Sequence, residues 1–186
     1  MHNNTGIFKV DIIHLLLYGV RRFYFTKLER LVMAIIYVAM GSNMGDREER
    51  VLHAVHKMRT FANVKKISTL GETEAEGPNK GQPKFINAVV ELDTAYEPEE
   101  VLDELLQIEE ELGRNIEEKG KNMPREIDLD LIVYGDEVVK TDRLTIPHPR
   151  MTERQFVMAP LAELNPKWVH PETGESIQDI LKKFPS

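Results

Sequence analysis

Apolar residues recur at two spacings along this chain, and each spacing predicts one kind of element. Residues 34–40 form a continuous apolar run, which is typical of a central strand covered on both faces. Residues 64–70, 85–92 and 127–133 carry apolar residues in alternation or in short runs, which predicts three further strands. We therefore expect four strands between residues 34 and 133.

Between these strands, apolar residues recur every three or four positions, the spacing of an amphipathic helix. The first helix follows a glycine-containing turn at residues 41–46, with Asp46 as its N-cap and Glu49 at its third position. The second begins at residues 97–100, where proline and glutamate suit a first turn, and ends at Gly113. The apolar positions are Val51, Ala54, Val55, Met58 and Phe61 in the first helix, and Val101, Leu102, Leu105, Ile108 and Leu112 in the second.

The order of these elements is strand, helix, strand, strand, helix, strand. That order predicts an α+β fold of the ferredoxin-like, split-βαβ type, in which an antiparallel sheet is backed by two helices. After the fourth strand, residues 135–136 predict a hairpin turn into a strand at 137–140. Short helices are expected near the C-terminus, at residues 156–164 and 176–183.

The composition is that of a globular protein with one domain. The chain has 186 residues, 41% of them hydrophobic and 30% charged, which is enough for one core and too few for two domains of usual size. The absence of cysteine excludes disulfides, thiolate metal sites and a cysteine nucleophile, and favours a cytoplasmic enzyme. The net charge of −7 argues against a general nucleic-acid-binding protein.

Residues 1–33 differ in charge from the rest of the chain. Five basic and two acidic side chains give this segment a net charge of +3, which leaves −10 for residues 34–186. Its apolar run, residues 12–18, is too short to span a membrane, and the basic residues follow the run, unlike those of a signal peptide. The segment is either an arm that binds a partner or a dispensable extension upstream of a native start at Met33. We favour the second interpretation and expect the domain to span residues 34–186.

Asp128 and Asp130 are two polar positions in an otherwise apolar strand. Because side chains alternate between the faces of a strand, both carboxylates share one face, about 7 Å apart. Two unpaired anions on a half-buried strand are costly, and two divalent cations about 4 Å apart would neutralise them and bind phosphate oxygens. The alternative is that both carboxylates face solvent and pair with lysine or arginine. Loops predicted at residues 71–84 and 114–123 are expected to cover the same face.

Four sequence blocks follow the order found in one enzyme family. They are residues 41–43, 82–88, 124–131 and 143–151, which read GSN, QPKFINA, PREIDLDL and RLTIPHPRM. From Ala34 to the C-terminus the chain resembles 6-hydroxymethyl-7,8-dihydropterin pyrophosphokinase, an enzyme of folate biosynthesis. The resemblance implies transfer of the diphosphate of ATP to the pterin hydroxymethyl oxygen, leaving AMP. Such a reaction is accelerated mainly by positioning and charge neutralisation.

The resemblance also implies roles for single residues. The catalytic residues would be Arg114, Arg125, Asp128 and Asp130, with the two aspartates holding two Mg²⁺ ions. Residues that match the ATP site are Glu109, Arg125, Leu131, Arg143, Thr145, His148 and Arg154. Residues that match the pterin site are Thr73, Gly77, Phe85, Asn87, Asp128 and Phe156, the phenylalanines lying on either side of the ring. The alternatives are that Glu109 lies on a solvated helix surface and that His148 has a structural role.

Two other functions fit part of the pattern. Ferredoxin-like sheets also bind RNA through aromatic residues on an open face, but the charge of −10 and the paired aspartates disfavour this. A two-metal phosphohydrolase would share Asp128 and Asp130, but the four blocks contain no residue placed to activate water. Asn122 and Met123 stand where the family often has Trp and Gly, so the closing of that loop is expected to differ.

Overall fold

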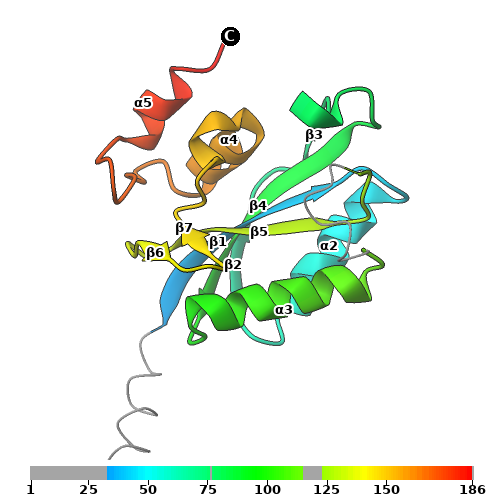
Figure 1. Cartoon of the computed structure of the whole chain (residues 1–186), viewed down its shortest axis with the longest axis horizontal. Coiled ribbons are helices and arrows are strands. Elements are labelled where there is room, and N and C mark those ends of the chain that lie inside the picture. Colours follow the sequence, from blue (N-terminus) through cyan, green and yellow to red (C-terminus); the bar gives the residue numbers. More distant parts are fainter. Residues whose placement is uncertain (1–32, 76, 115–122, 186) are drawn as a thin grey trace, which may run out of the picture. The chain divides into compact units, whose positions relative to one another are not determined.

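The computed structural model describes residues 33–75, 77–114 and 123–185. The predicted extension up to residue 32 and most of the predicted loop at 114–123 lie outside the described residues. No helix in the described ranges is long and apolar enough to cross a membrane. The elements, drawn in Figure 1, are β1 (Ala34–Ser42), α2 (Arg47–Met58), β2 (Asn63–Ile67), β3 (Gly71–Thr73), a 3-10 turn (Gly77–Asn79), β4 (Phe85–Thr94), α3 (Pro98–Glu111), β5 (Asp128–Tyr134), β6 (Val139–Lys140), β7 (Thr145–Ile146), a second 3-10 turn (Met151–Glu153), α4 (Gln155–Leu164) and α5 (Ile177–Leu181).

The long strands form one antiparallel sheet in the order β2-β4-β1-β5, and short β3 pairs with β4 beyond the end of β2. This is the order of a split-βαβ fold, as the succession of elements predicts. Helices α2 and α3 pack against each other on one face of the sheet. The expected α+β fold is therefore confirmed.

The larger apolar core lies between the sheet and these two helices. Alternate residues of β1, β4 and β5 are buried there together with most of the predicted helix stripes. The helix starts follow the sequence as well. Asp46 accepts a hydrogen bond from the Glu49 backbone N–H at 3.1 Å, and Glu100 accepts one from the Glu97 N–H at 2.9 Å. Local capping and apolar periodicity thus fix this half of the fold.

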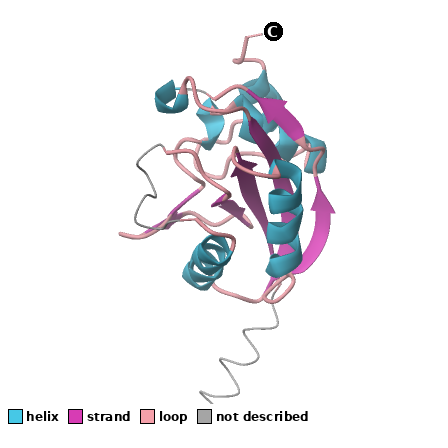
Figure 2. Ribbon diagram, turned by 90° about the vertical axis from the view of Figure 1, so that its right-hand side faces the viewer, coloured by secondary structure: helices cyan, strands magenta, loops and turns pink. Residues whose placement is uncertain are grey.

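The opposite face of the sheet is only partly open. Helices α4 and α5 cover one end of it and build a second apolar core that includes Tyr37, Val89 and Trp168. Figure 2 shows the strands between two groups of helices. A β-bulge in β5 contributes to this core: the register shifts between Tyr37 and Val38, so both Ile132 and Val133 join it. The uncovered part of the face lies toward β3 and the start of β5.

Part of the predicted loop at residues 71–84 is regular structure. The second strand ends at Ile67, and a separate strand, β3, begins at Gly71 after three intervening residues. β3 pairs with β4, with Gly71 opposite Asn87, and a 3-10 turn follows at Gly77–Asn79. Apolar periodicity did not reveal these elements because they are short and are held by backbone pairing rather than by a buried stripe.

The C-terminal hairpin exists, but its partners differ from the expectation. The strand after the turn at residues 135–136 is β6, and it pairs with β7 rather than with the aspartate strand β5. A tight turn closes the hairpin, with the Thr141 N–H donating to the Leu144 carbonyl at 2.9 Å. A turn signal predicts a change of direction but not which strand will pair.

Candidate active site

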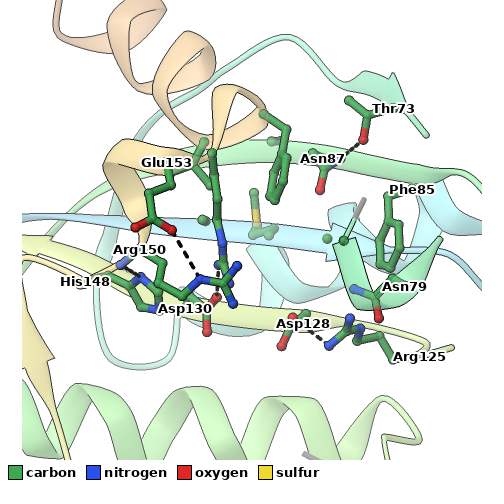
Figure 3. A pocket seen from close by; sticks show the side chains of 18 of the residues that line it. Thr73, Asn79, Phe85, Asn87, Arg125, Asp128, Asp130, His148, Arg150 and Glu153 are labelled. Atoms are coloured by element: carbon green, nitrogen blue, oxygen red, sulfur yellow. Dashed lines mark hydrogen bonds and ion pairs between the residues drawn. The ribbon is translucent and has the colours of Figure 1, made fainter. Parts of the chain in front are cut away.

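A cavity of about 570 Å³ lies on the uncovered part of the sheet, a size typical of small-molecule sites. Its floor comes from β1, β4 and β5, and its walls come from residues 73–79 and 148–157. Figure 3 shows side chains from these segments converging on one space. The predicted site residues that line it are Thr73, Gly77, Phe85, Asn87, Arg125, Asp128, Asp130, His148, Arg154 and Phe156.

Three strands place functional side chains in a row across the floor. Gly41 of β1 pairs with Asn87 of β4 on one side and with Asp128 of β5 on the other. Paired residues of an antiparallel sheet point to the same face, so Asn87 and Asp128 flank Gly41 on the cavity side. Gly41 keeps this space open, because a Cβ there would lie 3.1 Å from Asn87 Oδ1. Ala39, another small residue, pairs with Asp130 in the next row.

The end of the cavity near β3 combines aromatic rings with an amide. The Asn87 side chain donates to Thr73 Oγ1 at 2.8 Å. Phe85 lines the same end and lies 5.4 Å, measured to its ring centroid, from the guanidinium carbon of Arg125. Phe156 at the start of α4 also lines the cavity. Rings and an amide together suit a flat heterocycle that carries hydrogen-bonding edges.

Arginines neutralise the two aspartates. Arg125 Nη1 lies 3.1 Å from Asp128 Oδ2, and Arg114 donates to Asp128 Oδ1. Arg154 Nη1 lies 3.4 Å from Asp130 Oδ2. The aspartate side chains remain 26% and 27% exposed. Both carboxylates can therefore still reach a ligand in the cavity.

The donor set at the aspartates fits magnesium. Within the described ranges, no group of three or more His, Asp or Glu side chains gathers as a metal site would. Mg²⁺ is nevertheless commonly bound through one or two carboxylates, with phosphate and water oxygens completing its shell. Asp128 and Asp130 supply such a pair on one face of β5 and border the same cavity.

A buried ion pair lies behind Asp128. Glu109 of α3 is fully buried, and its carboxylate accepts hydrogen bonds from Arg114 and, at 2.7 Å, from the Leu129 backbone N–H. Burial lowers the pKa of Arg114, but the adjacent Asp128 and Glu109 outweigh it and raise the pKa above its ordinary value. Neither Glu109 nor Arg114, both described residues, borders the cavity. Glu109 orients Arg114 and fixes the backbone between the two aspartates.

The surroundings of His148 in the cavity wall favour its neutral form. Its Nδ1 accepts a hydrogen bond from the Arg150 backbone N–H at 3.2 Å, so the ring proton is on Nε2. Burial lowers the pKa of His148, and the charges of Arg154 and Arg150 lower it further, although Asp130 raises it. A neutral imidazole with a proton on Nε2 can donate a hydrogen bond to an anionic oxygen.

A model of the 7,8-dihydro-6-hydroxymethylpterin-pyrophosphokinase (HPPK) family matches residues 37–166. The chain belongs to this family. The 2-amino-4-hydroxy-6-hydroxymethyldihydropteridine pyrophosphokinase of Aquifex aeolicus is 41% identical over 139 residues, which cover 75% of this chain and 85% of that protein. The Bacillus subtilis protein of the same name is 44% identical over 132 residues, 70% of this chain and 77% of that one.

Solved structures of the family share the fold. A triple-mutant HPPK-DHPS chain of Plasmodium falciparum has a TM-score of 0.63 at 17% identity, with 82% of this chain and 44% of that chain covered. The wild-type HPPK-DHPS solved with pterin and p-hydroxybenzoate has a TM-score of 0.62 at 15% identity, with 82% and 42% covered. This chain therefore spans less than half of those longer chains.

Besides Glu109, three residues expected at the ATP site do not border the cavity of the described structure. Leu131 is buried in the core that faces α2 and α3. Arg143 forms an ion pair with Asp103 of α3 at the surface. Thr145 lies in β7. Their positions in the sequence blocks predicted a place at the ATP site, but their side chains are not among those that line the cavity.

The cavity also contains residues that the sequence analysis did not assign. Gly41 could have been identified because it opens the GSN block. Its role, which is to leave space on the cavity floor, depends on the register of three strands. Arg150 Nε lies 3.5 Å from Glu153 Oε2 at the mouth next to His148. No sequence pattern identified Glu74 or Asn79, the two unassigned residues that line the cavity from the segment before β4. The unassigned lining residues include Ala39, Gly41, Glu74, Asn79, Arg150 and Glu153.

Proposed function

We propose that this cavity binds a hydroxymethyl-dihydropterin next to the triphosphate of ATP. As an HPPK, the chain transfers the diphosphate of ATP to the hydroxymethyl group of 6-hydroxymethyl-7,8-dihydropterin, giving AMP and the pterin diphosphate in folate biosynthesis. The row Asn87, Gly41 and Asp128 supports the placement of the substrates, because it puts an amide and a carboxylate on one open floor.

The pterin occupies the end near β3. Phe85 and Phe156 line this space and contact the two faces of the ring. Asn87 and Thr73, already joined by a hydrogen bond, present amide and hydroxyl groups to the heterocycle edge. Gly77 contributes loop backbone to the same edge. A ring in this position directs its hydroxymethyl group toward Asp128.

The triphosphate occupies the end between β5 and α4. His148 and Arg154 line this end, and Arg125 lies beside Phe85 and Asp128, so local cations compensate for an acidic domain. His148 donates through Nε2 to a phosphate oxygen. Leu131 and Arg143, which are packed or paired elsewhere, receive no side-chain contact with substrate in this proposal.

The reaction is an in-line displacement at the β-phosphorus. A bond forms from the hydroxymethyl oxygen to this phosphorus as the bond to the α-phosphate oxygen breaks. Asp128 accepts the hydrogen bond of the attacking hydroxyl and takes its proton, AMP leaves with the α-phosphate oxygen, and Arg125 stabilises charge on the transferred group. Arg114 acts from behind by holding Asp128. Asp128 and Asp130 would hold the Mg²⁺, two ions in our proposal, which neutralises the phosphate oxygens when bound.

A product assay tests this function. The full chain is mixed with Mg²⁺, ATP and the hydroxymethyl-dihydropterin, and AMP and inorganic phosphate are measured. We expect AMP only when pterin and Mg²⁺ are both present. Phosphate release that does not depend on pterin would instead support a two-metal phosphohydrolase. We place the reaction in the cytoplasm, which suits a chain without cysteine.

A further inference from the structure

Asn43 belongs to the GSN block, and the reaction proposed above gives it no role. It follows β1 directly and is only 2% exposed. This described residue does not line the cavity, yet it is hydrogen-bonded to two segments that do. Burying an amide costs free energy unless its polar atoms are hydrogen-bonded, so the partners of Asn43 are what keep it buried at this position.

The first segment is the short stretch before β5 that contains Arg125. The Arg125 N–H donates to Asn43 Oδ1 at 2.8 Å, and the Asn43 N–H donates to the Arg125 carbonyl at 3.2 Å. These two hydrogen bonds fix the backbone of Arg125. Its side chain then lies by Phe85 and reaches Asp128, as Figure 3 shows. Asn43 thus sets the position of a guanidinium at the reacting end of the cavity.

The second segment is the loop before β4. Asn43 Nδ2 donates to Gln82 Oε1 at 3.1 Å and to the Pro83 carbonyl at 3.4 Å. Gln82 in turn donates from Nε2 to Asn79 Oδ1 at 3.3 Å and from its backbone N–H to the Asn79 carbonyl at 3.0 Å. Asn79 lines the cavity next to Phe85. The chain of hydrogen bonds therefore runs from Asn43 to the wall at the pterin end.

We infer that Asn43 is a positioning residue that couples the loop of residues 77–84 to Arg125. Its carbonyl oxygen holds the arginine segment, and its two amide hydrogens hold the loop, so one side chain keeps both walls at a fixed separation. The role proposed for it is specificity for the pterin rather than contact with any substrate. This inference rests on the proposed function, because it assigns the pterin to the end of the cavity near Asn79.

Asn43→Asp separates the two halves of this coupling. The carboxylate keeps an oxygen for the Arg125 N–H, but it loses both donors and faces the oxygens of Gln82 and Pro83 instead. Gln82→Ala removes the loop partner from the other side, at a half-buried position where folding is expected to be unaffected. The control is Asn165→Asp, which removes an amide donor to Tyr37 at the far end of α4.

The readout is the affinity for each substrate, measured by calorimetry. We expect the Kd for the pterin, with an unreactive ATP analogue present, to rise about tenfold in Asn43→Asp and in Gln82→Ala. The double variant should bind pterin no more weakly than the weaker single variant, because both changes break one connection. The Kd for the ATP analogue alone should stay within about twofold of wild type in all of them, and Asn165→Asp should leave both affinities unchanged.

The possible outcomes separate this inference from the function on which it rests. If wild type forms AMP only with pterin, but the variants bind pterin normally, lose both ligands equally, or show effects that multiply, the coupling role is refuted. If wild type shows no pterin-dependent AMP, the function fails, and the inference falls with it. Should Asn43→Asp not fold, Gln82→Ala still decides, since an unchanged pterin Kd there contradicts the coupling.

Discussion

Asp128 shows what strand alternation can and cannot predict about one side chain. Alternation placed it on the same face of the strand as Asp130, and in the structure both side chains border the cavity on the face away from α2 and α3. Its partners could not be predicted in the same way. Arg114 comes from the residues just after α3 and is oriented by Glu109, which is buried rather than a solvated surface residue. The carboxylate is held from behind as well as from the cavity.

Asp130→Asn is expected to lower kcat/KM by about 100- to 1,000-fold, which corresponds to about 3–4 kcal/mol of transition-state stabilisation. The reason is the loss of one of the two carboxylates that we propose to hold Mg²⁺ against the phosphates. Steady-state AMP formation measures it, and titration with Mg²⁺ should show a weaker apparent affinity for the metal. Asp136→Asn, in an exposed turn at the other end of β5, is the control. Near-normal turnover in Asp130→Asn would contradict the proposed role of Asp130 in holding Mg²⁺.

The raised pKa of Tyr37 predicts that the free energy of unfolding changes at high pH. Burial, together with the hydrogen bond to Glu91, raises the pKa of Tyr37 from 10.0 to about 12. Between these values the unfolded chain has lost a proton that the folded chain keeps, so the free energy of unfolding falls as pH rises. In Tyr37→Phe this fall should be smaller, by up to about 2–3 kcal/mol. Urea unfolding at about pH 9 and about pH 12 compares the two proteins. Equal losses in both would contradict the shifted pKa.

At the scale of elements, helices with clear caps and stripes were predictable, and two of the short strands were not. α2 and α3 carry their own signals in the form of Asp46, Glu100 and the buried apolar positions. β3 and β7, which no sequence pattern predicted, are three and two residues long. Elements of that length form because a neighbouring strand offers hydrogen-bonding partners to their backbone. Their own sequence does not indicate which strand that will be.

The second apolar core makes α5 a stabilising element. Ile180 is 1% exposed and belongs to the core that α4 and α5 form over the sheet. Ile180→Ala should lower the free energy of unfolding by about 2–5 kcal/mol, because it leaves a cavity in that core. Urea unfolding monitored by circular dichroism measures the change. Val169→Ala, at a side chain 48% exposed, should change it by less than about 0.5 kcal/mol. A similar effect of both variants would show that α5 contributes little.

At the scale of the whole molecule, the folded domain is expected to be independent of residues 1–32. β1 begins at Ala34, the HPPK match begins at residue 37, and the two described cores draw on residues 34–184. A chain starting at Met33 should therefore unfold at the same urea concentration as the full chain and form AMP at the same rate. Loss of folding or of activity on this deletion would mean that the N-terminal segment contributes to one of them.

The sequence by itself determined the order of elements, the helix caps and the face that carries Asp128 and Asp130. These features depend on neighbours a few residues apart, where periodicity and capping act. Only the tertiary structure decided which part of that face stays open. Helices α4 and α5 cover the rest, and the β-bulge in β5 adds Ile132 to the core beneath them. It also decided the contacts of Asn43, whose partners Gln82 and Arg125 lie 39 and 82 positions away. Contacts over such separations arise from strand register and packing, which local patterns do not encode.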